Sequence, residues 1–213
     1  VGLKPGINNA AVDHFRIRVH GKSTHVSTPH LGVDALYIAS QIVVAVQGLV
    51  TRRTSPTEPV IIGIGKLNAG TTYNAVAAFA EMEGTTRTIS QESRDRVRAQ
   101  VSETAQSIAA LYGGTAEIEW TDFAAALIND PQVCREAAEV VDELLGAGHV
   151  VTDRELSLSG DNFAEFELYK PGAYAYLGTG NPDLPHTMIT NHNGGFDVDE
   201  NALVTGAGLY VGY

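Results

Sequence analysis

The stretch DHFRIRVHG, residues 13–21, decides the fold of the first half of the chain. Within it the apolar residues Phe15, Ile17 and Val19 alternate with arginines. A period of two is typical of a β-strand that buries one face and leaves the other in water. The sequence therefore predicts an amphipathic strand as the first regular element.

Four further patterns follow this strand in a fixed order. Helical spacing of apolar residues runs from Leu31 to about Val50, strand patterns cover residues 59–67 and 77–89, a second helix follows the candidate N-cap Ser90, and TAEIEWT at 115–121 alternates again. The order is β-α-β-β-α-β. This order is that of the ferredoxin-like split βαβ arrangement, in which two helices cover one face of a four-stranded antiparallel sheet.

The texture of the sequence changes after Phe123. A helix begins with Asn129 or Asp130 as its cap and ends at Gly146, and a strand-like AYAYLGTG lies at 173–180. A final helix is expected from about Glu200. These elements show no core of their own, so residues 129–213 are not expected to form a complete domain.

Composition excludes several classes of protein. The 213 residues are 18% charged and 44% hydrophobic, which is ordinary globular composition, and the formal charge is −11. A negative chain with scattered Lys and Arg is a poor ligand for nucleic acid. No apolar run is expected to reach the roughly 20 residues of a membrane span, and no signal-peptide core precedes the first strand. We expect a cytoplasmic protein that binds neither nucleic acid nor membrane, with the single cysteine, Cys134, as a buried thiol.

The first candidate site is the loop GKSTHVSTPH, which contains His25 and His30. The more common explanation of such loop histidines is a helix-entry turn in which each imidazole is solvated or bonded to the backbone, so the pair alone does not identify a site. The five-residue spacing across Pro29 also differs from the i,i+4 spacing of a helical metal site.

Two further loops contain candidate residues. In NAGTTYN, Gly70 permits close approach of a ligand and the Asn74 amide offers a donor and an acceptor, although turn chemistry alone explains the loop. Arg87 in GTTRT offers a fork for a carboxylate, or is a solvated sheet arginine. In TNHNGGFDVDE, His192 is a candidate metal ligand.

An acidic cluster follows His192. It consists of Asp197, Asp199 and Glu200. Carboxylates favour the first turn of a helix, so the cluster is expected to cap the last helix.

Taken in order, the motifs resemble one family. They are GKSTHVSTPHLGVDA, LNAGTTYN, EGTTRT, NDP before a helix, SGDNFAEF, YAYLGTGNP and NHNGGFDVDENAL. In this order they are similar to the metal-dependent amidohydrolases of the aminoacylase and carboxypeptidase kind, closest to the hippurate and auxin-conjugate hydrolase branch. The resemblance implies hydrolysis of the amide bond of N-acyl amino acids or small peptide-like substrates.

The resemblance also implies an architecture. Residues 1–12 would be a linker, 13–123 a ferredoxin-like lid that pairs with a second lid in a homodimer, and 124–213 the C-terminal part of an α/β zinc-peptidase-like catalytic domain. The N-terminal part of that domain, with most metal ligands and the general base, would be missing. We therefore expect the chain alone to be inactive.

Site residues carry over from the resemblance position by position. His25 matches the lid histidine that polarises the scissile carbonyl, Asn74 and Arg87 match substrate-holding residues, and Gly178 with Gly180 matches the wall of the substrate cleft. His192 matches one ligand of a divalent metal pair, zinc, manganese or similar, and His30 is expected to be structural.

Two loops depart from the family pattern. Gly194 and Gly195 stand where the family usually has Pro and a bulky residue, and residues 160–163 replace a Ser-Glu-Asp-Phe. The rival interpretations are a non-catalytic dimerisation or ligand-binding module, which would use an open sheet edge, and a regulatory small-molecule-binding domain.

Overall fold

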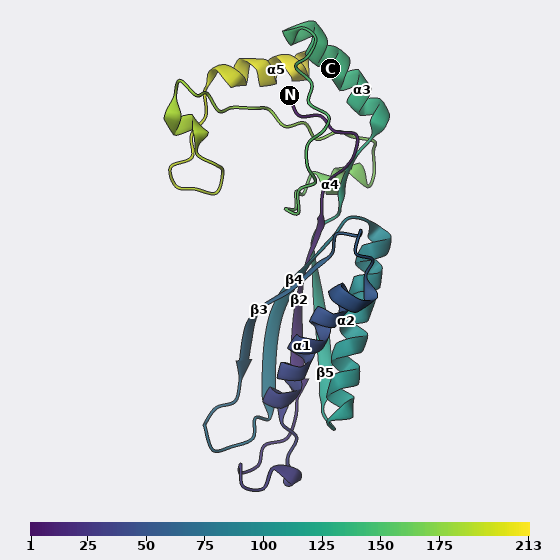
Figure 1. The fold of residues 1–213 in the computed structure, drawn as a ribbon, viewed down its shortest axis with the longest axis vertical. Coiled ribbons are helices and arrows are strands. Elements are labelled where there is room, and N and C mark those ends of the chain that lie inside the picture. Colours follow the sequence, from purple (N-terminus) through teal and green to yellow (C-terminus); the bar gives the residue numbers. More distant parts are fainter. The chain divides into compact units, whose positions relative to one another are not determined.

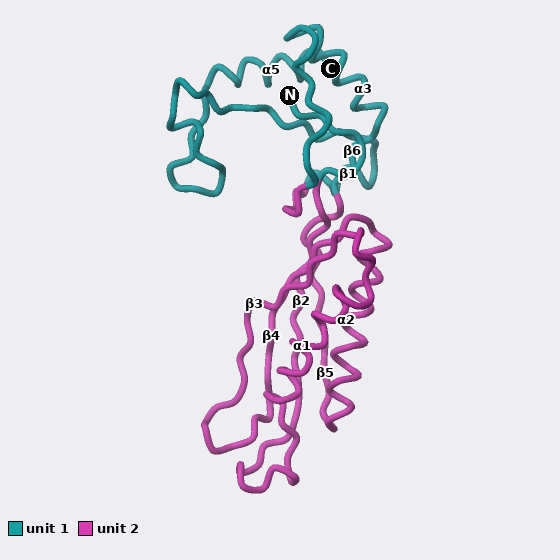
Figure 2. The backbone as a smooth tube through the Cα atoms, viewed as in Figure 1, with its two compact units in different colours: residues 1–8, 127–156, 163–213 teal, residues 9–126, 157–162 magenta.

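The computed structural model describes residues 1–213, which divide into two compact units (Figure 2). Unit 1 holds residues 1–8, 127–156 and 163–213, and unit 2 holds residues 9–126 and 157–162. The sequence suggests divisions near residues 13 and 123, whereas the compact units divide after residues 8 and 126. A short segment from the second half of the chain, 157–162, also joins unit 2.

Unit 2 is built on a four-stranded antiparallel sheet. Its strands are β2 (Ala11–His20), β3 (Ile61–Ala69), β4 (Phe79–Thr88) and β5 (Thr115–Ala124), in the order β3-β4-β2-β5. The helices α1 and α2 separate them in the chain, so the elements follow the order that the sequence predicts. β3 and β5 are the two edges.

The helices α1 (Ala35–Arg53) and α2 (Gln91–Leu111) cover one face of this sheet (Figure 1). The Asp34 side chain caps α1 and the predicted cap Ser90 caps α2 by accepting a hydrogen bond from the Ser93 N–H. The largest fully buried side chains between helices and sheet are Phe15, Ile17, Ile38, Ile42 and Met82. The period-two residues of β2 therefore form the centre of the core.

A buried ion pair lies at the end of this core. Arg94 of α2 donates to both carboxylate oxygens of Asp13 on β2, at 3.1 and 3.0 Å from Nε and 2.6 Å from Nη2. The two side chains are only 7% and 1% exposed. Asp13 interrupts the apolar face of β2, and this pairing is the reason that a charge is tolerated there.

The opposite face of the sheet is polar and carries charges of both signs. Arg18 of β2 lies between Glu81 of β4 and Glu119 of β5, with N···O distances of 3.2 Å to each. These pairs are partly exposed, so each contributes little to stability. No helix of unit 2 covers this face (Figure 1).

A carboxylate outside the sheet ties the segment before β3 to α2. Hydrogen bonds from Ser93, and then from Arg96, lower the pKa of Glu58, while desolvation by burial opposes them. The charged form of Glu58 is therefore favoured in the folded state.

The helix α1 corrects one expectation from sequence. Its 19 residues are long and apolar enough to cross a membrane by length and composition alone, although no apolar run was expected to reach that length. Core helices pass the same test, and α1 buries six residues against the sheet and α2: Ala35, Ile38, Ala39, Ile42, Val46 and Leu49. Its apolar character is thus used in the core of unit 2.

Unit 1 consists mainly of helices and loops. It holds β1 (Gly6–Asn9, whose last residue belongs to unit 2) paired with β6 (Leu127–Asn129), and the helices α3 (Pro131–Leu145), α4 (Ala164–Glu167) and α5 (Asn201–Gly212). The stretch expected to be a linker thus contains β1 and the start of β2. The segment 173–180, which has a strand-like sequence, forms only an isolated bridge, between Tyr176 and Gly2, because no neighbouring strand continues the pairing.

The start of α3 agrees with the sequence. Of the two candidate caps, Asp130 accepts hydrogen bonds from the N–H groups of Gln132 and Val133, and Pro131 is the first helical residue. Cys134 is 3% exposed, so the thiol is buried as expected. Burial raises the pKa of the thiol, and a hydrogen bond with Asn129 opposes this in part. The raised pKa makes the thiol a weak nucleophile.

Candidate functional site

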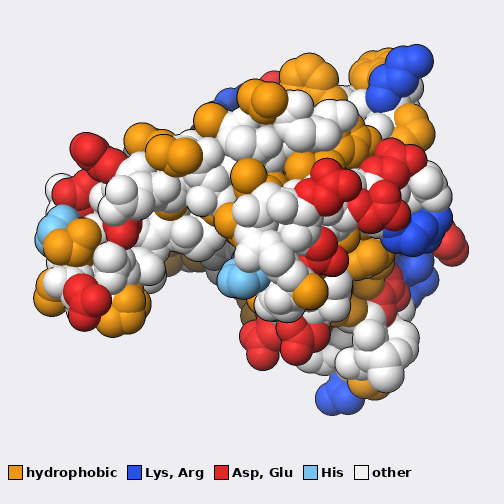
Figure 3. Space-filling model, turned by 90° about the horizontal axis from the view of Figure 1, so that it is seen from above, with side chains coloured by type: hydrophobic (Ala, Val, Ile, Leu, Met, Phe, Trp, Pro, Cys, Tyr) orange, Lys and Arg blue, Asp and Glu red, His pale blue; other side chains and the backbone are white.

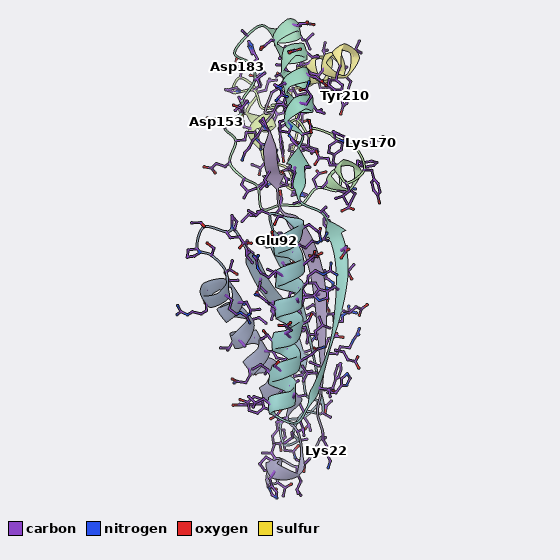
Figure 4. The ribbon with its side chains drawn as sticks, turned by 90° about the vertical axis from the view of Figure 1, so that its right-hand side faces the viewer. Lys22, Glu92, Asp153, Lys170, Asp183 and Tyr210 are labelled. Carbon is purple, nitrogen blue, oxygen red and sulfur yellow. The ribbon has the colours of Figure 1, made fainter.

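The loop GKSTHVSTPH, residues 21–30, which we call the histidine loop, lies at one end of unit 2. Figure 4 shows Lys22, in this loop, at the opposite end of the unit from Glu92, which lies in the first turn of α2. The loop contains a single short 3₁₀ turn, Pro29–Leu31, and then enters α1. Apart from this turn, its Gly, Ser, Thr and Pro residues form no helix or strand, so the backbone can follow a neighbouring loop instead.

That neighbouring loop is NAGTTYN, between β3 and β4. The Val26 N–H donates to the Asn74 carbonyl at 3.1 Å, the Val76 N–H donates to the Thr24 carbonyl at 2.8 Å, and His25 forms a bridge with Ala75. His25 and Asn74 are both exposed. The structure thus brings together two candidate residues that are 49 positions apart in the sequence.

The hydrogen bonds of His25 select one tautomer. Its Nδ1 lies 3.2 Å from the Ser27 backbone nitrogen and 2.7 Å from Ser27 Oγ. A backbone N–H only donates, so Nδ1 is the acceptor, and in the neutral ring the proton is then on Nε2. Nε2 makes no hydrogen bond within the chain and remains free to donate to a ligand.

Ser27 was not among the candidates from sequence. A hydroxyl residue two positions after a loop histidine is a local signal that could have identified it, since side chains of Ser commonly bond to groups two residues away. Its contact gives His25 a defined orientation despite the exposed position. The pair His25–Ser27 is therefore held together by two contacts at Nδ1.

A hollow of about 330 Å³ lies beside the two loops. Its walls come from residues 69–73 and 75–77 together with Val26, Asp34 and Leu36, and Asn74 is not among them. Gly70 has φ +74, a left-handed conformation that favours glycine, and it opens the loop backbone toward this hollow. Tyr73 is 95% exposed at its rim.

Arg87 lies at the other end of the sheet. On β4, Phe79 pairs with His20 next to the histidine loop, whereas Arg87 pairs with Val12, and at about 3.4 Å per residue the eight intervening steps span about 27 Å. Within one chain, unit 2 therefore does not bring Arg87 to His25.

The donors of Arg87 are partly used by the protein itself. Nε donates to the Leu158 carbonyl at 3.0 Å, and Nη1 donates to Thr85 Oγ1 at 2.5 Å and to the Thr86 carbonyl at 2.9 Å. Neither N–H group of Nη2 donates to another residue of the chain. Arg87 can therefore bind a carboxylate through Nη2 while it also fastens the segment 157–162.

In unit 1, the candidate glycines lie where a long loop begins. The Asp199 N–H donates to the Thr179 carbonyl at 2.9 Å, between Gly178 and Gly180, and Asn181 Nδ2 donates to Asp199 Oδ2 at 2.8 Å. These bonds close the loop that carries His192. The Asn181 hydrogen bond, followed by those from Asn201, lowers the pKa of Asp199.

The acidic cluster has the expected capping role in one of its members. Asp199 Oδ1 accepts from the Asn201 N–H at 3.0 Å at the start of α5, whereas Glu200 makes no capping bond through its side chain. Thr187 was missed from sequence. It is 4% exposed, and its Oγ1 accepts from the Asn181 N–H at 2.8 Å, so it supports the loop from within.

His192 is exposed and has a left-handed backbone, with φ +62. This conformation is uncommon for a non-glycine residue, although histidine adopts it more often than most residue types do. His186 Nε2 lies 3.8 Å from Asp197 Oδ2 in the same loop. The chain contains no group of three or more His, Cys, Asp or Glu side chains that could hold a metal ion. Zinc sites normally use at least three protein ligands, so the candidate His192 alone would not complete one.

Comparison with known proteins gives consistent matches. A family profile described as a peptidase dimerisation domain matches residues 10–112. The N-acetyl-L-cysteine deacetylase of Bacillus subtilis is 34% identical over 204 residues, which are 96% of this chain and 47% of that protein. Thermostable carboxypeptidase 1 of Saccharolobus solfataricus is 33% identical over 93% of this chain and 49% of its own length.

Solved structures agree with these sequence matches. The crystal structure of a dinuclear metal-binding peptidase of the M20 family from Bacillus subtilis superimposes with a TM-score of 0.78 and 29% identity, over 99% of this chain and 51% of that one. The chain thus spans about half the length of the relatives that it matches.

Proposed function

We propose that the chain is the lid and the C-terminal catalytic part of a two-metal amidohydrolase. The proposal is supported by the match of residues 10–112 to the peptidase dimerisation domain and by similarity over nearly the whole chain to hydrolases, one of them a peptidase of the M20 family. The single observation behind this proposal is similarity over more than nine-tenths of the chain to two enzymes named for hydrolysis, a deacetylase and a carboxypeptidase. The substrates would be N-acyl amino acids or small peptide-like amides, handled in the cytoplasm.

The assignment of the two parts uses the fold. Strand order β3-β4-β2-β5, with both helices on one face, supports a ferredoxin-like lid over residues 13–123. Residues 124–213 would be the C-terminal portion of an α/β zinc-peptidase-like domain. Residues 1–12 would connect the two parts.

His25 would act on the scissile carbonyl of the substrate. Its Nε2–H is set by the bonds of Nδ1 to Ser27 and has no partner in the chain. A donor that meets the oxyanion of a tetrahedral intermediate stabilises the transition state and is typically worth about 10²–10³ in rate. Asn74, in the adjoining loop, would hold the substrate amide from the same side.

Arg87 would take the free carboxylate of an N-acyl amino acid through Nη2. Because it lies at the far end of β4 from His25, the two groups would serve different active sites of a homodimer. His192 would supply one ligand to the metal pair, with Gly178 and Gly180 lining the cleft. The other ligands and the general base would come from outside these residues.

The edge of β3 is the best surface for pairing of two lids. Beside it, α1 presents an uncharged stripe of Leu36, Val44 and Gln47, and Gln47 Nε2 donates to the Ile62 carbonyl of β3 at 3.4 Å. The opposite edge, β5, exposes Glu117 and Glu119, which disfavour pairing with a second copy of the same strand. Pairing through β3 would continue the sheet across the dimer.

The test compares the chain alone with a protein that contains both this chain and the remaining half of the hydrolase. Hippurate and N-acetyl-L-cysteine are offered with zinc or manganese, and free amino acid is measured. We expect metal-dependent release from the longer protein and none from the chain alone. Release by the chain alone, or no release from either, contradicts the proposal.

A non-catalytic dimerisation module is the second candidate, and the α1 stripe beside the β3 edge is the observation that favours it. The two candidates differ in their dependence on metal. Dimers that form equally well with and without zinc, in a longer protein that never releases amino acid, favour the module.

A further inference from the structure

The Asn74 amide can either donate or accept a hydrogen bond, and the sequence alone leaves this choice open. In the structure Thr72 Oγ1 donates to Asn74 Oδ1 at 3.2 Å. The Asn74 Nδ2 group donates to no residue of the chain, so both of its N–H groups are available. The oxygen side of this amide therefore faces its own loop, and the nitrogen side is left for a ligand.

The backbone around Asn74 is held on both sides. The Asn74 carbonyl accepts from the Val26 N–H at 3.1 Å, and the next residue, Ala75, forms a bridge with His25. The side-chain torsions of Asn74 are then the main freedom that remains, and the contact with Thr72 restricts them.

The histidine loop shows the same arrangement. Ser27, two residues after His25, contacts Nδ1 and leaves Nε2–H without a partner. Thr72, two residues before Asn74, contacts Oδ1 and leaves Nδ2 without a partner. In both loops a hydroxyl residue two positions away engages the acceptor atom of a polar side chain, so the atom that remains for a ligand is a donor.

The charge of the two loops favours a ligand atom that carries negative charge. Residues 21–30 and 69–77 contain Lys22 and no Asp or Glu, although the whole chain has 25 acidic residues and a formal charge of −11. Elsewhere acidic side chains are more prominent than basic ones, as on the face of the molecule in Figure 3. Asp34, beside the hollow, is engaged through Oδ1 in capping α1. The loops themselves therefore do not repel an oxygen on which negative charge develops.

From these contacts we infer that Thr72 is a positioning residue, which holds the Asn74 amide so that Nδ2 donates to the carbonyl oxygen of the bound substrate. The inference rests on the proposed function and adds to it the direction of the Asn74 hydrogen bond and the residue that sets it. The carbonyl oxygen of an N-acyl amino acid gains negative charge when water attacks the carbonyl carbon. Asn74 would then give this oxygen a second donor beside His25 Nε2–H.

The first experiment observes the Asn74 side chain in the purified chain, without reference to activity. NMR relaxation of the side-chain amide measures how far Nδ2 is restricted on the picosecond-to-nanosecond timescale. We expect an order parameter above about 0.6 in the wild-type chain and below it in Thr72→Val, which removes the hydroxyl and keeps the shape. Thr72→Ser, which keeps the hydroxyl, should stay above this value.

The neighbouring threonine provides the matched control. Thr71 is exposed like Thr72, but its hydroxyl makes no hydrogen bond in the chain. Thr71→Val should therefore leave the order parameter of the Asn74 amide at its wild-type value.

The second experiment measures amino-acid release by the longer protein that contains this chain and the remaining half of the hydrolase. Thr72→Val should lower kcat about 3- to 10-fold with little change in KM, the size of effect expected for loss of one hydrogen bond that orients a donor. Thr72→Ser and Thr71→Val should stay within about 2-fold of the wild-type kcat, because the hydroxyl that contacts Asn74 is retained in both.

Two variants of Asn74 test the direction of its hydrogen bond. Asn74→Ala removes the donor and should lower kcat about 10- to 100-fold, as expected for a hydrogen bond to a charged group. Asn74→Asp keeps oxygen acceptors and loses the N–H groups, so it should lower kcat at least as much. Higher activity of Asn74→Asp than of Asn74→Ala would mean that residue 74 accepts from the substrate, and this result overturns the inference.

The relaxation data also separate this inference from the proposed function. An unchanged order parameter in Thr72→Val overturns the inference, and so does a fall in kcat that Thr72→Ser shares. If the wild-type longer protein releases no amino acid, the hydrolase proposal is contradicted, and the relaxation measurement still decides whether Thr72 positions Asn74.

Discussion

Replacement of Asp13 by alanine should be among the most damaging single changes in unit 2. Arg94 would remain 7% exposed without the carboxylate that takes three of its hydrogen-bond contacts. Loss of one partner of a buried pair typically costs about 3–5 kcal/mol. Asp122 lies 3.6 Å from Arg94 Nη2 and is 65% exposed, so it can take over part of the interaction, and we use the lower end, about 3 kcal/mol.

The loss is measured by urea unfolding followed through fluorescence. Trp120 is the only tryptophan, and it packs on Phe15 in the core of unit 2 with ring centroids 5.2 Å apart, so its signal reports that unit. For a chain of this size, about 3 kcal/mol corresponds to a fall of about 6–12 °C in Tm. Far-ultraviolet circular dichroism at low temperature checks that the variant still folds.

Two further variants test the cause. Glu119→Ala removes a partner from the exposed pair with Arg18 and should cost less than about 1 kcal/mol. Asp13→Leu combined with Arg94→Met should recover most of the lost stability, because no buried charge then remains unpaired. The reasoning is refuted if Asp13→Ala costs no more than Glu119→Ala, or if the double variant is less stable than Asp13→Ala.

Three other predictions concern the site, the packing and the response to pH. In the complete enzyme, His25→Ala should lower kcat by about 10²–10³ with little change in KM, measured by amino-acid release, because the lost donor acts in the transition state. Gly84→Val should destabilise unit 2 by about 1–3 kcal/mol in urea unfolding, since even a Cβ at this position would lie 2.2 Å from Phe15 Cζ. Gly65→Ala is the control, because a Cβ at Gly65 would meet no heavy atom within 4 Å. The pKa of Glu58 is lower in the folded state than in the unfolded state. Its contribution to stability is therefore present above the unfolded pKa of about 4.3 and is lost as the pH falls through the folded value. Glu58→Gln should lower Tm at pH 7 and leave Tm unchanged near pH 2.

Much of unit 2 could be predicted from local patterns. Alternation in residues 13–21 and 115–121 predicts two of the strands, and helical spacing with Ser90 as a cap predicts α2. These signals are local because a strand repeats every two residues and a helix every 3.6, so a short window contains them. The sequence also identified Asp130 as one of two candidate caps of α3.

The candidate site was only partly predictable. Sequence patterns selected His25 and Asn74 singly, but their contact depends on a bridge between two loops that are far apart in the chain. The bond between Ser27 and Nδ1 of His25, which sets the donor on Nε2, is visible only with side chains in place. The relation of Arg87 to these groups likewise depends on strand register, which hydrophobic alternation fixes only to within steps of two residues.

The sequence by itself determined the order of elements in unit 2, its core face and the acidic, disulfide-free character of the chain, because each follows from residue type and short-range spacing. The tertiary structure alone decided which strands are neighbours, that Asp13 is tolerated in the core through Arg94, and that Val204 and Val211 of α5 are exposed. These properties depend on contacts between residues far apart in the chain. Such contacts form only when the chain closes long loops, and no local window of sequence contains the free energy that decides between them.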